Sequence, residues 1–247
     1  MLTRYCLELT PDRPCTPGPE WGYRLYAVLL ERAPKDFGIQ VHQMNISPIS
    51  QFLDCRARQM KWVISLLGNQ AEEALGDLLE SPAPLRLTKD EVMLSPVLKN
   101  TDRIADPDEM FFRAAQGSGR HVLQFRTPTA FKSRGNYQIL PTSRLILQNL
   151  INKWNGCFSD CMIEDEDGEG IEAMADGLVC RRFQLHDQRY FLKGNSIPGF
   201  VGTLTLDNQL KGFHRELVDM LLTFAGYAGV GIKTSLGMGG VEHRTEA

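Results

Sequence analysis

The most informative stretch of this chain is Phe224–Gly240, FAGYAGVGIKTSLGMGG, close to the C-terminus. It holds six glycines, interleaved with single apolar residues and one Lys-Thr-Ser triplet at 233–235. Glycine accepts positive φ and lets a ligand approach the backbone, so such a run suits N–H groups that line an anion. A helix over 210–225 precedes it and a short strand over 240–244 follows, unlike the strand–loop–helix order of a Walker loop. The stretch therefore predicts either a phosphate contact at a sheet edge or a tight helix-to-strand turn.

The rest of the chain reads as two similar halves. Strands are expected over 2–9, 47–58, 61–66 and 85–94, with helices over 23–33 and 70–79. In the second half strands are expected over 120–125, 177–183, 188–193 and 199–206, with helices over 143–155 and 211–225. This repeated order predicts an α+β protein with tandem ferredoxin-like (RRM-like) domains and a C-terminal glycine-rich loop. We expect an N-terminal domain over 1–100, a linker over 101–117 and a C-terminal domain over 118–247.

Composition narrows the class of protein. The 247 residues contain no apolar run of membrane-spanning length, and Arg4, Glu8 and Asp12 interrupt the N-terminus. The six cysteines are scattered without a CxxC pair, and Cys157-x3-Cys161 lacks a second close pair for zinc. We therefore expect a cytoplasmic protein with reduced thiols, no membrane partner, no metal and no cofactor.

The net charge of −3 hides an uneven distribution. Residues 110–159 hold seven basic side chains and no acid, which could supply a positive track for a phosphate backbone. Residues 160–176 hold eight acids and no base, which indicates a solvated loop. A calcium loop starting at Asp165 is the alternative, but Glu172 stands where such a loop needs an apolar residue.

Three segments together resemble the CRISPR repeat-processing endoribonucleases of the repeat-associated mysterious protein superfamily. Residues 229–239 fit the family's C-terminal pattern G-x-G-x-K-T-x-x-G-x-G. Residues 123–131, LQFRTPTAF, with Leu140-Pro141 and the following helix, resemble the start of its second domain. Residues 23–53 resemble its histidine loop, with His42 after the first helix.

The resemblance implies a metal-independent endoribonuclease that cuts CRISPR repeat transcripts into guide RNAs. The products would carry a 5′-hydroxyl and a 2′,3′-cyclic phosphate. The alternative is a catalytically silent RNA-binding subunit that holds guide RNA in an effector complex. In both cases the partner is CRISPR repeat RNA or guide RNA, with other effector subunits as further partners.

Metal-free RNA cleavage needs a base, an acid and a positive group beside the phosphorane. Imidazole titrates near neutral pH, and the resemblance points to His42 in an exposed loop. Some relatives carry a tyrosine late in the first helix, where this chain has Leu30; Tyr26 lies one turn earlier and is the second catalytic candidate. The relatives' lysine after the histidine is missing here. The candidates for its role are Lys35, Arg56, Arg58, Ser47 and Ser50.

The expected RNA-binding residues come from the glycine loop and the basic stretch. They are Gly229, Gly231, Lys233, Thr234, Ser235, Gly237, Gly239, Arg126, Lys132 and Arg134.

Overall fold

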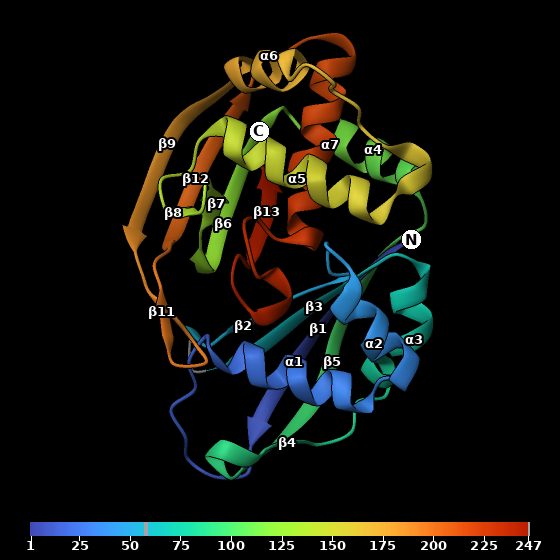
Figure 1. The fold of residues 1–247 in the computed structure, drawn as a ribbon, viewed down its shortest axis with the longest axis vertical. Helices are drawn as coiled ribbons and strands as arrows, with labels where there is room; N and C mark the ends of the chain where they lie inside the picture. Colours follow the sequence, from blue (N-terminus) through green and yellow to red (C-terminus); the bar gives the residue numbers. More distant parts are fainter. Residues whose placement is uncertain (57–58, 247) are drawn as a thin grey trace.

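The computed structural model describes residues 1–56 and 59–246, which form two halves (Figure 1). The first half consists of β1 (Leu2–Pro11), α1 (Trp21–Arg32), α2 (Lys35–Gln43), β2 (Ile49–Asp54), β3 (Met60–Leu67), α3 (Asn69–Glu80), β4 (Leu85–Leu87) and β5 (Val92–Ile104). Its antiparallel sheet has the order β2-β3-β1-β5-β4. Leu7 of β1 packs in one buried cluster with Leu25 of α1 and Leu75 of α3, so both helices belong to this core.

The second half builds a four-stranded sheet of the order β13-β6-β12-β9. Its elements are α4 (Pro107–Ala115), β6 (Arg120–Thr129), β7 (Phe131–Ser133), β8 (Asn136–Gln138), α5 (Ser143–Cys157), α6 (Glu169–Gly177), β9 (Leu178–Asp187), β10 (Tyr190–Leu192), β11 (Asn195–Ile197), β12 (Phe200–Asn208), α7 (Gly212–Ala228) and β13 (Val241–Thr245). The pairs β7–β8 and β10–β11 are separate hairpins. In both sheets the first strand of the half lies between the third and the last, the ferredoxin-like order. The α+β fold expected from the sequence is therefore confirmed.

Helix α5 shows how local sequence sets the core of the second half. The side chain of Thr142 accepts a hydrogen bond from the amide of Leu145 and caps the helix. Apolar residues then recur at three-four spacing and are buried. Trp154 at the end of this face packs edge-on against Phe224 of α7, with 5.3 Å between the ring centroids. This contact between α5 and α7 fixes the end of α7, where the glycine loop begins (Figure 1).

Two expectations about residues 85–117 are wrong in detail. The last strand of the first sheet is β5, which continues to Ile104, whereas residues 85–94 hold only the short β4 and the beginning of β5. Residues 101–117, expected as a linker, hold the end of β5 and helix α4. Asp106 caps α4 by accepting from the amide of Glu109, and Pro107 occupies the first turn, so the Asp and Pro content marks a helix start.

The acidic segment 160–176, expected as a solvated loop, contains most of helix α6, and Asp165 caps the start of this helix. Both carboxylate oxygens of Asp165 accept backbone hydrogen bonds, from Gly170 at 3.0 Å and Ile171 at 2.8 Å, at the beginning of α6. Asp165 would be the first ligand of the calcium loop considered as an alternative, and both of its carboxylate oxygens are used in these bonds. Among the described residues no cluster of three or more His, Cys, Asp or Glu side chains could hold a metal ion.

Two further findings concern the cysteines and the length of the helices. All six cysteines are free thiols. Across residues 1–56 and 59–246, no helix is both long and apolar enough to cross a membrane.

Candidate active site

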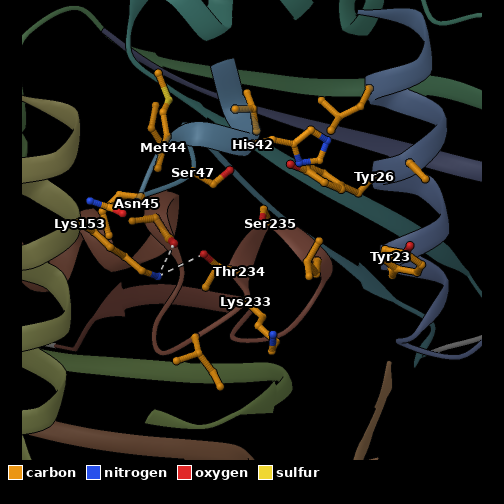
Figure 2. A pocket seen from close by; sticks show the side chains of 18 of the residues that line it. Tyr23, Tyr26, His42, Met44, Asn45, Ser47, Lys153, Lys233, Thr234 and Ser235 are labelled. Carbon is orange, nitrogen blue, oxygen red and sulfur yellow. Dashed lines mark hydrogen bonds between the residues drawn. The ribbon is translucent and has the colours of Figure 1, made fainter. Parts of the chain in front are cut away.

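A cavity of about 860 Å³ opens between the two halves. The first half contributes one face of α1 and the segment from α2 to the start of β2. The second half contributes α5, the glycine loop between α7 and β13, and the tip of the β10–β11 hairpin. The candidate catalytic residues and the Lys-Thr-Ser triplet line this one cavity (Figure 2): they are Tyr26, His42, Lys233, Thr234 and Ser235.

His42 lies in the last turn of α2, so the expected histidine loop is a short helix here. Pro34 ends α1 and at the same time forms the N-cap of α2. Phe37 and Val41 bury the inner face of α2, which turns His42 outward as an exposed side chain. The helix therefore presents the imidazole to the cavity.

Tyr26 projects from α1 toward the same part of the cavity (Figure 2). Burial raises the pKa of its phenol, and the neighbouring hydroxyls of Ser47 and Ser235 partly offset this effect. Tyr23 and Leu30 flank Tyr26 at one-turn spacing, and both also line the cavity. A phenol with a raised pKa stays protonated at neutral pH, so it can donate a proton or a hydrogen bond.

The residues expected to stabilise the phosphorane differ in whether they line the cavity. Ser47 lines the cavity, whereas Lys35, Arg56 and Ser50 do not. Arg56 forms an ion pair with Asp54 at 2.9 Å. Arg58 lies outside the described residues. Three lysines among the described residues line the cavity: the exposed Lys233 and Lys193, and the buried Lys153. Lys193 was not singled out from the sequence.

Most amides of the glycine loop are used inside the protein. The amide of Gly231 donates to the Asn149 side chain at 2.7 Å, and that of Gly239 donates to Pro128 O at 3.0 Å. Residues 229, 230, 232, 236, 238 and 240 also donate internally. Within the described part of the chain, the amides of residues 233–235 have no intramolecular acceptor. Gly231, Ile232 and Leu236 line the cavity as well, but their amides donate internally, so among the described loop residues that line it only this triplet has amides without an internal acceptor.

The glycines themselves are required by packing. A Cβ on Gly231 would lie 2.4 Å from Ala130 O, and one on Gly239 would lie 2.1 Å from Val230 O. Both residues have positive φ, as do Gly229 and Gly237. Close approach and left-handed backbone together explain why this turn needs glycine. RNA contact by these glycines remains a prediction.

Lys153 of α5 holds the glycine loop in place through hydrogen bonds. Its buried amine donates to Ala228 O and Gly229 O, each at 2.9 Å, and to Thr234 Oγ1 at 3.3 Å (Figure 2). It therefore caps the C-terminus of α7 and orients the triplet. Burial lowers the pKa of this amine to about 7. Lys153 is a structural residue here, not part of a positive track.

The expected positive track is largely neutralised. Arg113, Arg120, Arg126 and Arg144 all form ion pairs, with Asp102, Asp207, Glu242 and Glu172 respectively. The Nε atom of Arg126, one of the expected RNA-binding residues, donates to Glu242 at 2.8 Å. Lys132 and Arg134, on the exposed β7–β8 hairpin, form no ion pair with any described residue. Of the basic stretch, these two remain available for phosphate.

The fold and this cavity define a class: two ferredoxin-like halves whose C-terminal glycine loop closes a cavity equipped with imidazole, phenol and ammonium groups. Residues 123–241 match the family described as CRISPR-associated endoribonuclease Cas6. A CRISPR-associated endoribonuclease Cas6 from Streptococcus thermophilus is 27% identical over 92% of both chains. One from Mycobacterium tuberculosis is 27% identical over 97% of this chain and 77% of its own length. A solved Cas6 product complex shares the fold with a TM-score of 0.76 and 23% identity, covering 99% of both chains.

These comparisons support the resemblance that the three segments indicated: the chain is similar to CRISPR-associated Cas6 endoribonucleases over most of its length. The matched region begins in β6 and ends at the first residue of β13, so it includes the whole glycine loop.

Proposed function

We propose that this protein is a metal-independent endoribonuclease that cuts CRISPR repeat transcripts into guide RNAs. Its products carry a 5′-hydroxyl and a 2′,3′-cyclic phosphate. The observation that carries the proposal is the convergence of His42 and Tyr26 from the first half with Lys233, Thr234 and Ser235 from the second on one cavity. We place its action in the cytoplasm.

His42 is the residue suited to move a proton at neutral pH. In the first step a base removes the proton from the 2′-hydroxyl, whose oxygen attacks the adjacent phosphorus. The 5′-oxygen leaves and takes a proton from an acid. Tyr26, whose raised pKa keeps it protonated, is suited to donate to the phosphate or to the leaving oxygen.

The triplet 233–235 is suited to hold the phosphate. Lys233 is an exposed cation, and three amides face no internal acceptor. Lys132 and Arg134, both exposed on the β7–β8 hairpin, are the further candidates for phosphate contact. The catalytically silent subunit is not favoured, because the relatives that match over most of their length are endoribonucleases and the cavity holds proton-transfer groups.

The decisive experiment incubates the pure protein with a repeat RNA from the host's CRISPR arrays in the presence of EDTA. We expect one cut per repeat and a 2′,3′-cyclic phosphate end. A single 2′-deoxy substitution upstream of the cut should abolish cleavage. Cleavage that EDTA stops and magnesium restores would show a metal nuclease instead.

His42→Ala tests the proton-transfer role. We expect the single-turnover rate to fall by about 10²–10⁴-fold, with RNA affinity within a few-fold, because the imidazole acts in the transition state. His214→Ala is the matched control, since His214 is an exposed histidine outside the cavity. Full activity of His42→Ala would remove His42 from the mechanism.

A further inference from the structure

The β10–β11 hairpin carries a cation to the cavity on a rigid support. Lys193 and Gly194 form its two-residue turn with φ of 50° and 81°, the geometry of a tight type I′ hairpin. Tyr190, Leu192 and Ile197 of the hairpin are buried in one cluster with Met238 of the glycine loop. The Tyr190 hydroxyl also lies 2.5 Å from Leu236 O and 3.2 Å from Pro19 O. The hairpin is therefore anchored to both the loop and the first half.

Lys193 at the tip lines the cavity and holds its ammonium over an aromatic ring. Its Nζ atom lies 5.2 Å from the ring centroid of Tyr23. The side chain is exposed and forms no ion pair with any described residue. An exposed cation–π contact is weak, so a ligand can displace this ammonium from the ring.

Tyr23 places that ring at a defined distance from the catalytic candidates. It lies three residues before Tyr26 on the same face of α1, about one helical turn or roughly 5 Å away. The ring is half-buried because it packs against the cluster of hairpin and glycine loop. This packing holds the ring in one orientation at the cavity wall (Figure 2).

We propose that Tyr23 and Lys193 form a subsite for one unpaired nucleotide next to the scissile phosphate. The base stacks on the Tyr23 ring in place of the ammonium, and Lys193 turns to the phosphate of the same nucleotide. Stacking on an aromatic ring tolerates every base, so the subsite fixes the position of the strand without reading its sequence. This inference rests on the proposed function, because it assumes that the cavity holds the cut site.

The first test measures binding of a repeat RNA made uncleavable by a 2′-deoxy at the cut site. We expect Tyr23→Leu, which keeps an apolar packing group, to weaken binding about tenfold through lost stacking. Tyr23→Phe keeps the ring and should bind within twofold of the parent. Lys193→Gln should reduce the log–log salt slope by about 0.7, the value for one phosphate contact on a single strand. Lys211→Gln, at the far end of α7, should change neither quantity.

The second test locates the nucleotide by an abasic scan across the cut site in the parent protein. We expect one position to lose about tenfold in affinity, and Tyr23→Leu to be insensitive to the abasic change at that position alone. A flat scan, or equal binding of Tyr23→Leu and the parent, overturns the subsite. An unchanged salt slope in Lys193→Gln overturns the role of Lys193. The scan uses the parent, so it decides even where Tyr23→Leu folds poorly. Failure of the parent to cut any repeat RNA would instead overturn the proposed function.

Discussion

Lys153 places its amine 2.9 Å from the carbonyl oxygens of Ala228 and Gly229, in a fully buried site. Burial lowers the pKa from 10.5 to about 7, so the amine loses its proton within the range of ordinary buffers. The neutral amine still has two N–H donors for the carbonyls at the end of α7. Below pH 7 the same contacts must hold a buried ammonium.

Linkage then predicts how this residue affects stability. Between pH 7 and 10.5 the unfolded chain binds a proton that the native lysine has lost, so the free energy of unfolding rises with pH. Below pH 7 both states are protonated and the contribution is constant. We expect the difference in unfolding free energy between wild type and Lys153→Met to widen above pH 7 by up to about 1.4 kcal/mol per pH unit.

Urea melts at pH 5.5, 6.5, 8 and 9 provide the measurement. Lys211→Met, at an exposed position, is the control and should show no widening. A gap for Lys153→Met that stays constant from pH 5.5 to 9 would contradict the lowered pKa.

Helix α2 carries His42 and contains a glycine, Gly38, that lowers the stability of the helix. A Cβ at Gly38 would meet no atom within 4 Å, and its φ is an ordinary helical one. Glycine inside a helix costs about 0.5–1 kcal/mol relative to alanine. We expect Gly38→Ala to stabilise the protein by about this amount and to raise Tm by about 1–4 °C in thermal melts.

Gly231→Ala in the glycine loop is the comparison variant, for which we expect the opposite effect on stability. There φ is 86° and a Cβ would lie 2.4 Å from Ala130 O, so the same chemical change should lower Tm. Loss of RNA binding in this variant would follow from the altered loop and would not identify Gly231 as a contact. If Gly38→Ala melts below wild type, α2 is not a stable helix in solution.

The sequence predicted the regular elements better than the short ones. Strong periodicity identified α1, α5 and α7 to within a few residues. Helix α2 was missed because Pro34 reads as a stop and the nine residues that follow include glycine and histidine, which are weak helix formers. Helix α4 was missed because Asp106-Pro107 was interpreted as a linker, although the same pair is a helix-start signal.

Only those residues of the candidate site that belong to a recognisable sequence motif could be predicted. The pattern over 229–239 led to Lys233, and the resemblance of residues 23–53 to the family's histidine loop led to His42. The neutralisation of Arg126 was not predictable, because its partner Glu242 lies 116 residues away in sequence. Lys193 was also missed: the glycine after it is compatible with a hairpin turn, but nothing in the sequence shows that the tip of this turn reaches Tyr23.

A buried amide is one of the contacts that join the two halves. Gln51 of β2 donates to Gly22 O in α1 at 2.8 Å and to Ser235 O in the glycine loop at 2.9 Å. Its oxygen accepts from the Trp62 indole at 2.8 Å, so every contact of the side chain is internal. Gln51 is 1% exposed, and water cannot replace these bonds. Gln51 therefore helps to set the distance between Tyr26 on α1 and Ser235 on the loop.

Gln51→Leu should show that dependence. It fills the space but leaves the Trp62 indole N–H without its acceptor and removes one donor from each of the two carbonyls, and an unsatisfied buried group costs about 1–3 kcal/mol. We expect a lower Tm and, at temperatures where the variant is folded, a slower single-turnover cleavage of repeat RNA, because the loop loses its fixed distance from α1.

Gln51→Glu separates the hydrogen bonds from the packing. Its carboxylate would face two carbonyl oxygens at pH 7, whereas the protonated acid formed at lower pH can donate to one of them. Its stability deficit relative to wild type should therefore shrink between pH 7 and pH 5, and that of Gln51→Leu should not. Equal deficits at both pH values, or a Gln51→Leu protein as stable and as fast as wild type, would mean that the halves hold their spacing by packing alone.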